Sequence, residues 1–320
     1  MTARHNVLVL GGSGFVGRHV VARLVAASHR VTVVTRRIAQ GRHLLLLPTV
    51  DVVEADPYDL ASLTRLAHGM TVAINLVGII HEAGRQTFER AHVELPRLLV
   101  AACRAAGVSR LLHMSALTAS EHAPSKYLRS KAAGEKVVTD SSLGWTIFRP
   151  SVIFGREDSF LNLFARLLHK LPIVPLAGAD ARFQPVYVGD VAECFATALE
   201  LDATIANAYE LCGPRQYTLR ELVKYVGVVS GAERPIVPLG PGLAKLQALA
   251  LEMLPGKMMT RDNLASMRCD NVCSGAFPPI FRMTPTTLEA IAPEYLSPEA
   301  LHSRYDYYRA HVHKYVETRK

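Results

Sequence analysis

Several features that would assign this chain to a class at once are absent from its sequence. No uninterrupted run of about 18 apolar residues occurs, so we expect no membrane-spanning helix. There is no internal repeat and no low-complexity tract. Basic residues are spread along the chain, and no helix-turn-helix or RNA-binding signature is present, so we expect no nucleic-acid partner.

Cysteine is scarce as well. The five cysteines are scattered and odd in number: Cys103, Cys194, Cys212, Cys269 and Cys273. This usage is typical of reduced thiols in a cytosolic protein rather than of a disulfide framework. Cys103 and Cys194 fall on helix faces that we expect to be buried. No pair of histidines lies near the last two cysteines at ligand spacing, so we expect no metal site.

The composition that is present is that of a globular protein, with 49% hydrophobic and 20% charged residues. The net charge of +8 at pH 7 suits an anionic cofactor or an anionic membrane surface. A strand is predicted within the first ten residues, which leaves no room for a signal peptide. We therefore expect a cytoplasmic protein, with peripheral membrane association kept as an alternative.

A glycine-rich turn near the start of the chain is its most informative stretch. Gly11, Gly14 and Gly17 follow an apolar run and open an amphipathic segment, with the spacing GxxGxxG. Gly11 allows a turn that a Cβ would obstruct, and Gly17 lets the following helix pack close to the sheet. Gly14 lets backbone N–H groups approach phosphate oxygens at the positive end of that helix. We therefore predict that Gly11, Ser13, Gly14, Phe15 and Gly17 bind the pyrophosphate of a dinucleotide.

Strand and helix patterns alternate through the first half of the chain. The predicted strands are Asn6–Leu10, Arg30–Thr35, Val50–Glu54, Val72–Val77, Arg110–Ser115 and Trp145–Ile147. Near-continuous apolar strands separated by helices predict an α/β fold, a doubly wound parallel Rossmann sheet with a smaller C-terminal lobe on the substrate side. We expect an NAD(P)-binding core over residues 1–150, a return segment near 184–212, and a smaller, mixed lobe over residues 151–320.

The residues after the second predicted strand determine whether NAD or NADP is the preferred cofactor. An acidic residue there hydrogen-bonds the ribose hydroxyls of NAD and repels a 2′-phosphate. This chain has Arg36 and Arg37 instead, and two guanidinium groups suit a phosphate dianion. Arg42 is a further candidate for the same pocket. The sequence therefore favours NADP(H) over NAD(H). The alternative is that the two arginines are solvated surface residues with no role in binding.

Four more residues are expected near the cofactor. Asp56 follows the third strand and is placed to reach the adenine amino group or to cap a helix begun by Pro57, and the two roles are compatible. Val77 and Gly78 end the fourth strand, where a glycine lets the backbone pass close to the cofactor. Pro150 follows the sixth strand and lacks a backbone donor, which suits a strand end that passes the nicotinamide.

Tyr127 and Lys131 are spaced by four residues, so on a helix they lie on one face, one turn apart. A phenol of pKa about 10 is a poor acid–base group at neutral pH, and a nearby ammonium favours the phenolate and lowers that pKa. The tyrosine can then exchange a proton with a carbonyl or alcohol oxygen while a nicotinamide exchanges hydride. We expect Lys131 also to hydrogen-bond the nicotinamide ribose, and Ser115 to hold the substrate oxygen. His113, in the middle of a strand, is expected to be a packed core residue.

Five segments together carry a family resemblance: GGSGFVGRHV, YLRSK, FRPSVIFG, QPVYVGDVA and YELCGP. In this order they resemble the extended and atypical short-chain dehydrogenases/reductases, which include the NAD-dependent epimerase/dehydratase-like proteins. Over residues 1 to about 275 the chain is similar to bacterial relatives of the nucleotide-binding accessory subunit (alpha subcomplex subunit nine) of mitochondrial respiratory complex I. The resemblance implies bound NADP(H), a Tyr/Lys pair in Tyr127 and Lys131, and a small C-terminal substrate-side region.

Three departures count against a nucleotide-sugar substrate. Leu10 stands where sugar-nucleotide epimerases commonly have Thr, and Tyr127 follows Ser115 by only twelve positions, so the loop that shapes a sugar pocket is short. Those enzymes also usually have acidic or small residues after the second strand, where this chain has arginines. The first hypothesis is therefore an NADP(H)-dependent oxidoreductase that acts on a small or lipophilic carbonyl or alcohol. The alternatives are a non-catalytic NADP(H)-binding accessory or assembly subunit of a respiratory or quinone-linked membrane complex, and a nucleotide-sugar epimerase or dehydratase. The substrate and the oligomeric state, a homo-oligomer among the alternatives, are left open.

An apolar stretch over residues 240–254 bears on the second hypothesis. Its apolar residues recur at helical spacing: Leu243, Leu246, Leu249, Ala250 and Met253. Such a pattern predicts a lid or core helix of the C-terminal lobe. The alternative is a face that contacts a membrane complex.

Overall fold

The computed structural model describes residues 4–252 and 259–298. Within them, seven parallel strands form one sheet in the order β11-β6-β5-β4-β1-β2-β3. These strands are β1 (Asn6–Leu10), β2 (Arg30–Thr35), β3 (Val50–Glu54), β4 (Val72–Asn75), β5 (Arg110–Met114), β6 (Gly144–Pro150) and β11 (Asn207–Leu211). Strand order reverses between β1 and β4, as in a doubly wound sheet, so the predicted Rossmann class is confirmed.

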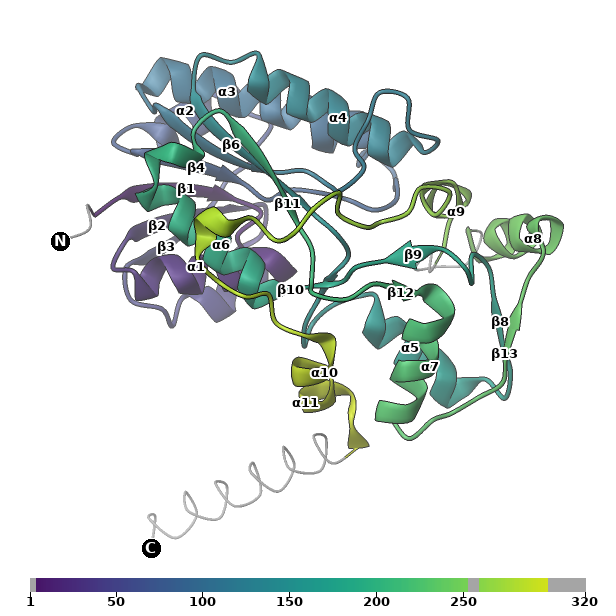
Figure 1. Cartoon of the computed structure of the whole chain (residues 1–320). Coiled ribbons are helices and arrows are strands. Elements are labelled where there is room, and N and C mark those ends of the chain that lie inside the picture. Colours follow the sequence, from purple (N-terminus) through teal and green to yellow (C-terminus); the bar gives the residue numbers. More distant parts are fainter. Residues whose placement is uncertain (1–3, 253–258, 299–320) are drawn as a thin grey trace, which may run out of the picture.

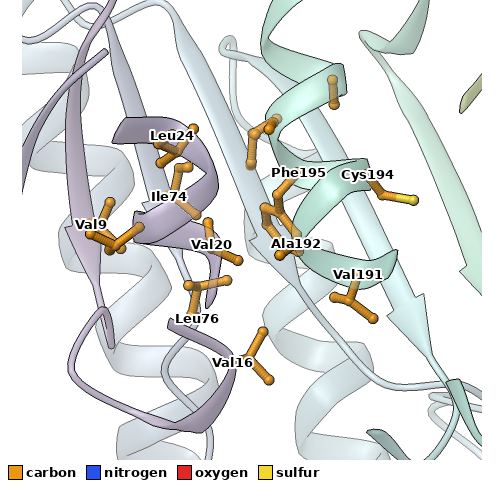
Figure 2. Packing of buried hydrophobic residues seen from close by; sticks show 14 of the residues in the cluster. Val9, Val16, Val20, Leu24, Ile74, Leu76, Val191, Ala192, Cys194 and Phe195 are labelled. Carbon is orange, nitrogen blue, oxygen red and sulfur yellow. The ribbon is translucent and has the colours of Figure 1, made fainter. Parts of the chain in front are cut away.

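Helices cover both faces of this sheet (Figure 1). One face carries α2 (Leu60–Ala67), α3 (Leu95–Ala106) and α4 (Lys126–Thr139), and the other carries α1 (Phe15–Ala26) and α6 (Val188–Glu200). Alternate residues of a strand pack on opposite faces of the sheet, because successive side chains point to opposite sides. Val9 lies in the hydrophobic cluster that includes Val20 of α1 and Phe195 of α6 (Figure 2), whereas Leu8 belongs to the cluster on the side of α2 and α3.

A smaller lobe with its own hydrophobic core follows the sheet. Its helices are α5 (Leu161–Lys170), α7 (Leu219–Val229), α8 (Pro241–Glu252), α9 (Arg261–Ser266), α10 (Leu288–Ile291) and α11 (Pro293–Leu296). Three two-stranded sheets complete it: β7 (Ile153–Phe154) with β10 (Val186–Tyr187), β9 (Arg182–Phe183) with β12 (Tyr217–Thr218), and β8 (Val174–Leu176) with β13 (Ile236–Pro238). Short helical segments lie at Ile38–Leu44 (η1), Arg90–Glu94 (η2, a π-helix), Asp202–Thr204 (η3) and Pro279–Phe281 (η4). The core of the lobe lies mainly between α5 and α7.

The first three predicted strands have the predicted bounds, and the later ones differ for local reasons. β4 ends two residues early because the Asn75 side chain accepts a hydrogen bond from Val77 N at 3.1 Å and removes that N–H from the ladder. β6 is longer than predicted because β11 pairs along it as far as Pro150. Within the expected return segment near 184–212, β10 pairs with β7, α6 packs on a face of the main sheet, and β11 is the strand that joins the sheet.

The expectation that all five cysteines remain thiols is wrong for one pair. Cys212, directly after β11, forms a disulfide with Cys273, their Cα atoms 6.1 Å apart. Gln184 brings the two segments together, because its side chain donates to Gly213 O at 2.7 Å and accepts from Cys273 N at 3.1 Å. The two cysteines are 61 residues apart, which hides the pairing from local sequence patterns. Cys103 and Cys194 are fully buried, as predicted, and burial raises the pKa of the Cys103 thiol to about 12.

None of the helices in the described ranges is long and apolar enough to cross a membrane.

Candidate active site

The glycine turn connects β1 to α1 at the carboxyl edge of the sheet. Gly11 has a φ of +80°, and a Cβ there would lie 2.9 Å from the backbone carbon of Leu76, so another residue would obstruct the turn. Gly14 is the N-cap of α1, its N–H donates to Gly11 O at 3.1 Å, and it has no side chain to cap the helix. The N–H groups that open this twelve-residue helix are therefore left for an anion.

Three more residues of this segment bear on the prediction. A Cβ on Gly17 would collide with Gly11 O and the Gly12 backbone, so this glycine lets α1 pack on the turn, rather than on the sheet as we predicted. Ser13 lies within the turn, and Phe15, the first residue of α1, lines the cavity described below. The turn thus fits a pyrophosphate, because it brings backbone rather than side chains to the anion.

Arg36 and Arg37 follow β2 and are exposed. No carboxylate in the described part of the chain lies within ion-pair distance of either one. With the Gln86 amide oriented so that its oxygen faces Arg36, that oxygen accepts from both terminal nitrogens at 2.6 and 2.7 Å. Glu54 accepts from Ile38 N at 2.7 Å and so holds the loop after the arginines. Both guanidinium groups keep their charge free for a phosphate. Arg42, in η1, is exposed as well.

Asp56 follows β3, but its predicted capping role is wrong. Helix α2 begins at Leu60, and Asp59 is its N-cap, accepting from Ala61 N at 3.2 Å. Asp56 instead accepts from Tyr58 N at 3.0 Å and closes the turn ahead of the helix. Pro57 therefore lies in this turn, before the helix begins.

The loop after β4 runs directly beside Lys131. Val77 is held there by Asn75, and Gly78 follows it. A Cβ on Gly78 would lie 3.1 Å from Lys131 Nζ, so glycine is the residue that leaves the ammonium room. The fourth strand and the Tyr/Lys helix therefore meet at this point.

Tyr127, Lys131 and Ser115 line one cavity, together with Pro150. Tyr127 and Lys131 lie on the first turns of α4, whose N-cap is Ser125. Lys131 is 3% exposed and donates to Met114 O at 3.2 Å. Ser115, directly after β5, is equally buried, and its hydroxyl has no hydrogen-bond partner among the described residues. An unpartnered hydroxyl facing a cavity fits a substrate oxygen, since leaving it unpaired is costly.

Burial dominates the titration of these groups. It raises the pKa of Tyr127 to about 12 and lowers the pKa of Lys131 to about 8, where Glu135 partly opposes the shift. The lowered tyrosine pKa that we predicted is therefore wrong for the protein without nucleotide. His113 is buried, as predicted, and burial together with the Lys131 charge lowers its pKa to about 3.

His92 is a residue of this site that sequence analysis did not identify. Its Nε2 accepts from Ile79 N at 3.1 Å, which leaves Nδ1 to donate to Ser130 Oγ at 2.8 Å. Ser130 Oγ donates in turn to Tyr127 O at 2.7 Å. The His92 ring packs edge-on against Tyr127, with centroids 5.6 Å apart, and burial lowers its pKa to about 2. A neutral histidine therefore joins the loop after β4 to the turn of α4 that carries the tyrosine.

Helix α9 of the smaller lobe also holds the start of α4. The Asp262 carboxylate accepts from Lys126 N at 2.7 Å and from Tyr127 N at 3.0 Å. These are N–H groups that a helix leaves unsatisfied at its first turn, and a negative charge is favoured there. Asp262 lies 135 residues from Tyr127, so no local pattern in the sequence indicates this contact.

We expect Asp262→Ala to destabilise the fold by about 1–2 kcal/mol, because two backbone N–H groups lose a charged acceptor. Urea denaturation followed by circular dichroism measures the change. Asp180→Ala is the matched control, since that carboxylate is 88% exposed and pairs only with the exposed Arg220. Equal stability of the two variants would show that α9 does not hold α4.

The cavity has a volume of about 800 Å³ and extends from the glycine turn into the smaller lobe. Beyond Tyr127 its walls are mostly apolar side chains of the helices and strands of the smaller lobe: Phe160, Phe164, Leu167, Leu176, Phe183 and Met267. Uncharged polar side chains, among them Ser159, Gln247 and Asn263, interrupt these walls. Among the described residues that line it, Lys131 is the only charged one. The walls come from α5, β8, α8 and α9. No pattern in the sequence indicated that these segments line one cavity.

A seven-stranded doubly wound sheet, a glycine turn at the start of α1 and a Tyr/Lys pair on α4 together define an NAD(P)-binding Rossmann protein of the short-chain dehydrogenase/reductase kind. A model of the NAD dependent epimerase/dehydratase family matches residues 7–212, and the chain belongs to this family.

Two relatives show the range within this similarity. The NADH dehydrogenase [ubiquinone] 1 alpha subcomplex subunit 9 of Rattus norvegicus is 38% identical over 224 residues, 68% of this chain and 59% of the rat protein. The chain thus spans less than two thirds of that relative's length. A ceramide reductase of Caulobacter vibrioides is 32% identical over 251 residues, 77% of this chain and 78% of that protein.

Among solved structures, the NADPH-dependent quinone oxidoreductase QOR2 of Escherichia coli, complexed with NADPH, has a TM-score of 0.73. The match covers 91% of this chain and 99% of that chain at 20% identity, so it shows the shared fold.

Proposed function

We propose that this protein is an NADP(H)-dependent oxidoreductase that reduces the carbonyl group of a lipophilic, long-chain substrate. The observation that carries the proposal is the cavity, in which Tyr127, Lys131 and Ser115 stand at one end and apolar walls continue beyond them. A nicotinamide cofactor supplies a hydride when it is bound. The turn at Gly11 and the unpaired Arg36 and Arg37 fit such a cofactor.

Each of the three side chains has a role that its surroundings support. Tyr127 keeps its proton at neutral pH, because burial raises its pKa, and so it can donate that proton to the oxygen of a reduced carbonyl. Ser115 offers its unpartnered hydroxyl to the same oxygen. Lys131, buried beside Gly78, is placed to hydrogen-bond the nicotinamide ribose and to favour the phenolate left behind.

The substrate class follows from the cavity walls. A nucleotide sugar carries a diphosphate that needs cations or several donors, and Lys131 is the only charged side chain that lines the described cavity. Apolar walls instead favour long alkyl chains, since burial of apolar surface drives such binding. The relative from Caulobacter vibrioides is named for a lipid substrate, a ceramide, which supports the same class.

We expect Arg36→Ser combined with Arg37→Ser to weaken NADPH binding by about 10- to 100-fold and to leave NADH binding nearly unchanged, because the lost charge pairs concern the 2′-phosphate. Fluorescence titration with each nucleotide measures the two dissociation constants. Arg97→Ser, an exposed arginine on α3, is the control. Equal weakening for both nucleotides would contradict the assignment of these arginines to the 2′-phosphate.

The test of the activity is NADPH oxidation at 340 nm with paired ketones that differ only in alkyl chain length. We expect kcat/KM to rise with chain length, because longer chains cover more of the apolar wall. Reduction of short and long ketones at equal kcat/KM would contradict a lipophilic substrate. No reduction of any ketone by a protein that binds NADPH would contradict the activity itself.

A second candidate function is a non-catalytic NADP(H)-binding subunit of a membrane complex. The similarity to the complex I subunits favours it. Its test is co-purification of the full chain with membrane proteins, coupled to turnover of the bound nucleotide. Retention of NADPH without turnover, together with a stoichiometric membrane-protein partner, would favour this function over the reductase.

A further inference from the structure

Helix α8 exposes the apolar residues that we expected it to bury. Its buried residues are the small Ala244 and Ala248. Leu243, Leu246 and Leu249, which we call the leucine face, are 60%, 62% and 42% exposed. A helix whose solvent side is apolar is the reverse of an ordinary surface helix. These leucines are not buried as in a core helix, whereas a lid helix and the alternative of a contact face both stay predictions. Met253 lies outside the described residues.

The leucine face lies beside the part of the cavity farthest from the glycine turn. Gln247 and Leu251 of α8 line the cavity, while the leucine face points away from it on the same helix. Gln247 donates to Pro175 O at 2.8 Å and so ties α8 to β8. Figure 1 shows α8 at the end of the smaller lobe away from the main sheet. Exposed apolar side chains continue on the connected strand pair and its approach: Leu171, Ile173 and Val237.

Two exposed lysines lie next to these apolar residues in the chain. Lys245 is exposed on α8, and Lys170 is exposed at the end of α5, directly before Leu171. Neither lysine forms an ion pair with any residue that the structure describes. Glu252, the only acidic residue of α8, is paired with Arg261 at 2.8 Å. Leucines beside unpaired lysines are complementary to a lipid surface with anionic headgroups.

We propose that α8 docks this protein onto an anionic lipid bilayer, with the leucine face in the interface. The uptake of substrate from the bilayer rests on the proposed function, whereas the docking rests only on the leucine face, on Lys245 of α8 and on Lys170 of α5. A long alkyl chain is scarce as a monomer in water, so an enzyme with an apolar cavity gains substrate by opening at the bilayer. A second copy of the chain is a weaker occupant, because two such surfaces would bring their lysines together.

The experiment is flotation of the full chain with vesicles of phosphatidylcholine, with and without phosphatidylglycerol. We expect binding to the anionic vesicles, and a loss of about 100-fold in partitioning for the triple variant Leu243→Ser, Leu246→Ser, Leu249→Ser. Leu45→Ser with Leu46→Ser is the matched control, because these leucines are 52% and 88% exposed and lie between η1 and β3, in the part of the chain that forms the main sheet. Lys170→Glu with Lys245→Glu is expected to remove the preference for anionic vesicles.

Three outcomes would overturn the proposal: no flotation of the wild-type chain, equal flotation of the triple variant and the wild type, or a wild-type dimer that the triple variant converts to a monomer. The last outcome would assign the leucine face to a second copy. A short, water-soluble ketone separates docking from catalysis, since its reduction should be the same in all variants. Flotation without reduction of any ketone would leave docking intact and contradict the proposed activity.

Discussion

We expect Tyr127→Phe to lower kcat for ketone reduction by about 1000-fold while NADPH binding stays unchanged. The substitution removes the hydroxyl and leaves the ring, which packs edge-on against Phe88 and His92 at centroid distances of 5.9 and 5.6 Å. Stability should therefore change little. Single-turnover kinetics with bound NADPH measures the chemical step, and fluorescence titration measures the nucleotide affinity.

Tyr225→Phe is the matched control for this loss. Its hydroxyl is buried without a hydrogen-bond partner in the described ranges, and it lies on α7, away from the cavity lining. Unchanged turnover in Tyr127→Phe would show that the phenol does not donate the proton to the carbonyl oxygen. Loss of NADPH binding in the same variant would instead show that the phenol holds the cofactor.

The pH dependence of the two reaction directions follows from the same phenol. Burial raises its pKa to about 12, so the tyrosine is protonated and ready to act as an acid throughout the neutral range. Carbonyl reduction by the wild-type protein should thus be nearly independent of the Tyr127 titration below pH 9, whereas alcohol oxidation needs the phenolate and should accelerate as pH rises. Rates of both directions measured between pH 6 and 7.5, where Lys131 with its pKa of about 8 stays mostly charged, check this. An oxidation rate that falls with rising pH would contradict a Tyr127 base.

The parts of the site that could be predicted from sequence depend on neighbours along the chain. The glycine turn joins one strand to the next helix, and the Tyr127–Lys131 spacing depends only on helix geometry. Gly78 follows β4 at the same carboxyl edge. In a parallel sheet all such strand ends meet at one edge, so a correct strand order brings these residues together without knowledge of the side chains.

The parts that could not be predicted depend on contacts between distant segments. Asp262 caps the start of α4 from 135 residues away, and Cys212 pairs with Cys273 through a bridge that Gln184 holds in place. The apolar pattern of α8 shows the correct helix but not which side is buried, because Ala244 and Ala248 fit against the lobe and the larger leucines do not. A periodic pattern shows that a helix has an apolar face, but the neighbouring elements determine whether that face is buried or exposed.

The pKa of Tyr127 shows the same limit in electrostatic form. Spacing correctly puts an ammonium one turn away, and a lower phenol pKa follows if Coulomb attraction dominates. Burial dominates instead, because it disfavours the charged form of both groups. It raises the pKa of Tyr127 and lowers the pKa of Lys131. How deeply the two groups are buried depends on the whole lobe that covers the site. The spacing of two residues in the sequence carries no information about that burial.

Lys131→Met is expected to abolish turnover and yet to stabilise the nucleotide-free protein by roughly 1–3 kcal/mol at pH 7. Lys131 is 3% exposed, and burial lowers its pKa from 10.5 to about 8, so the folded state holds the charged form at a cost. The lost hydrogen bond to Met114 O reduces the gain. Urea denaturation at pH 7 gives the difference, and Lys136→Met is the control, because that exposed lysine pairs with Asp140 on the same helix and its removal should not stabilise.

The pH dependence of the stability gain shows whether it comes from removal of the buried charge or from better packing. Between pH 8 and 10.5 the unfolded chain keeps the Lys131 proton that the folded chain has released, so this lysine makes wild-type stability rise with pH in that window. The advantage of Lys131→Met should accordingly shrink as pH approaches 10. A constant advantage from pH 7 to 10 would show that better packing, not the buried charge, stabilises the variant.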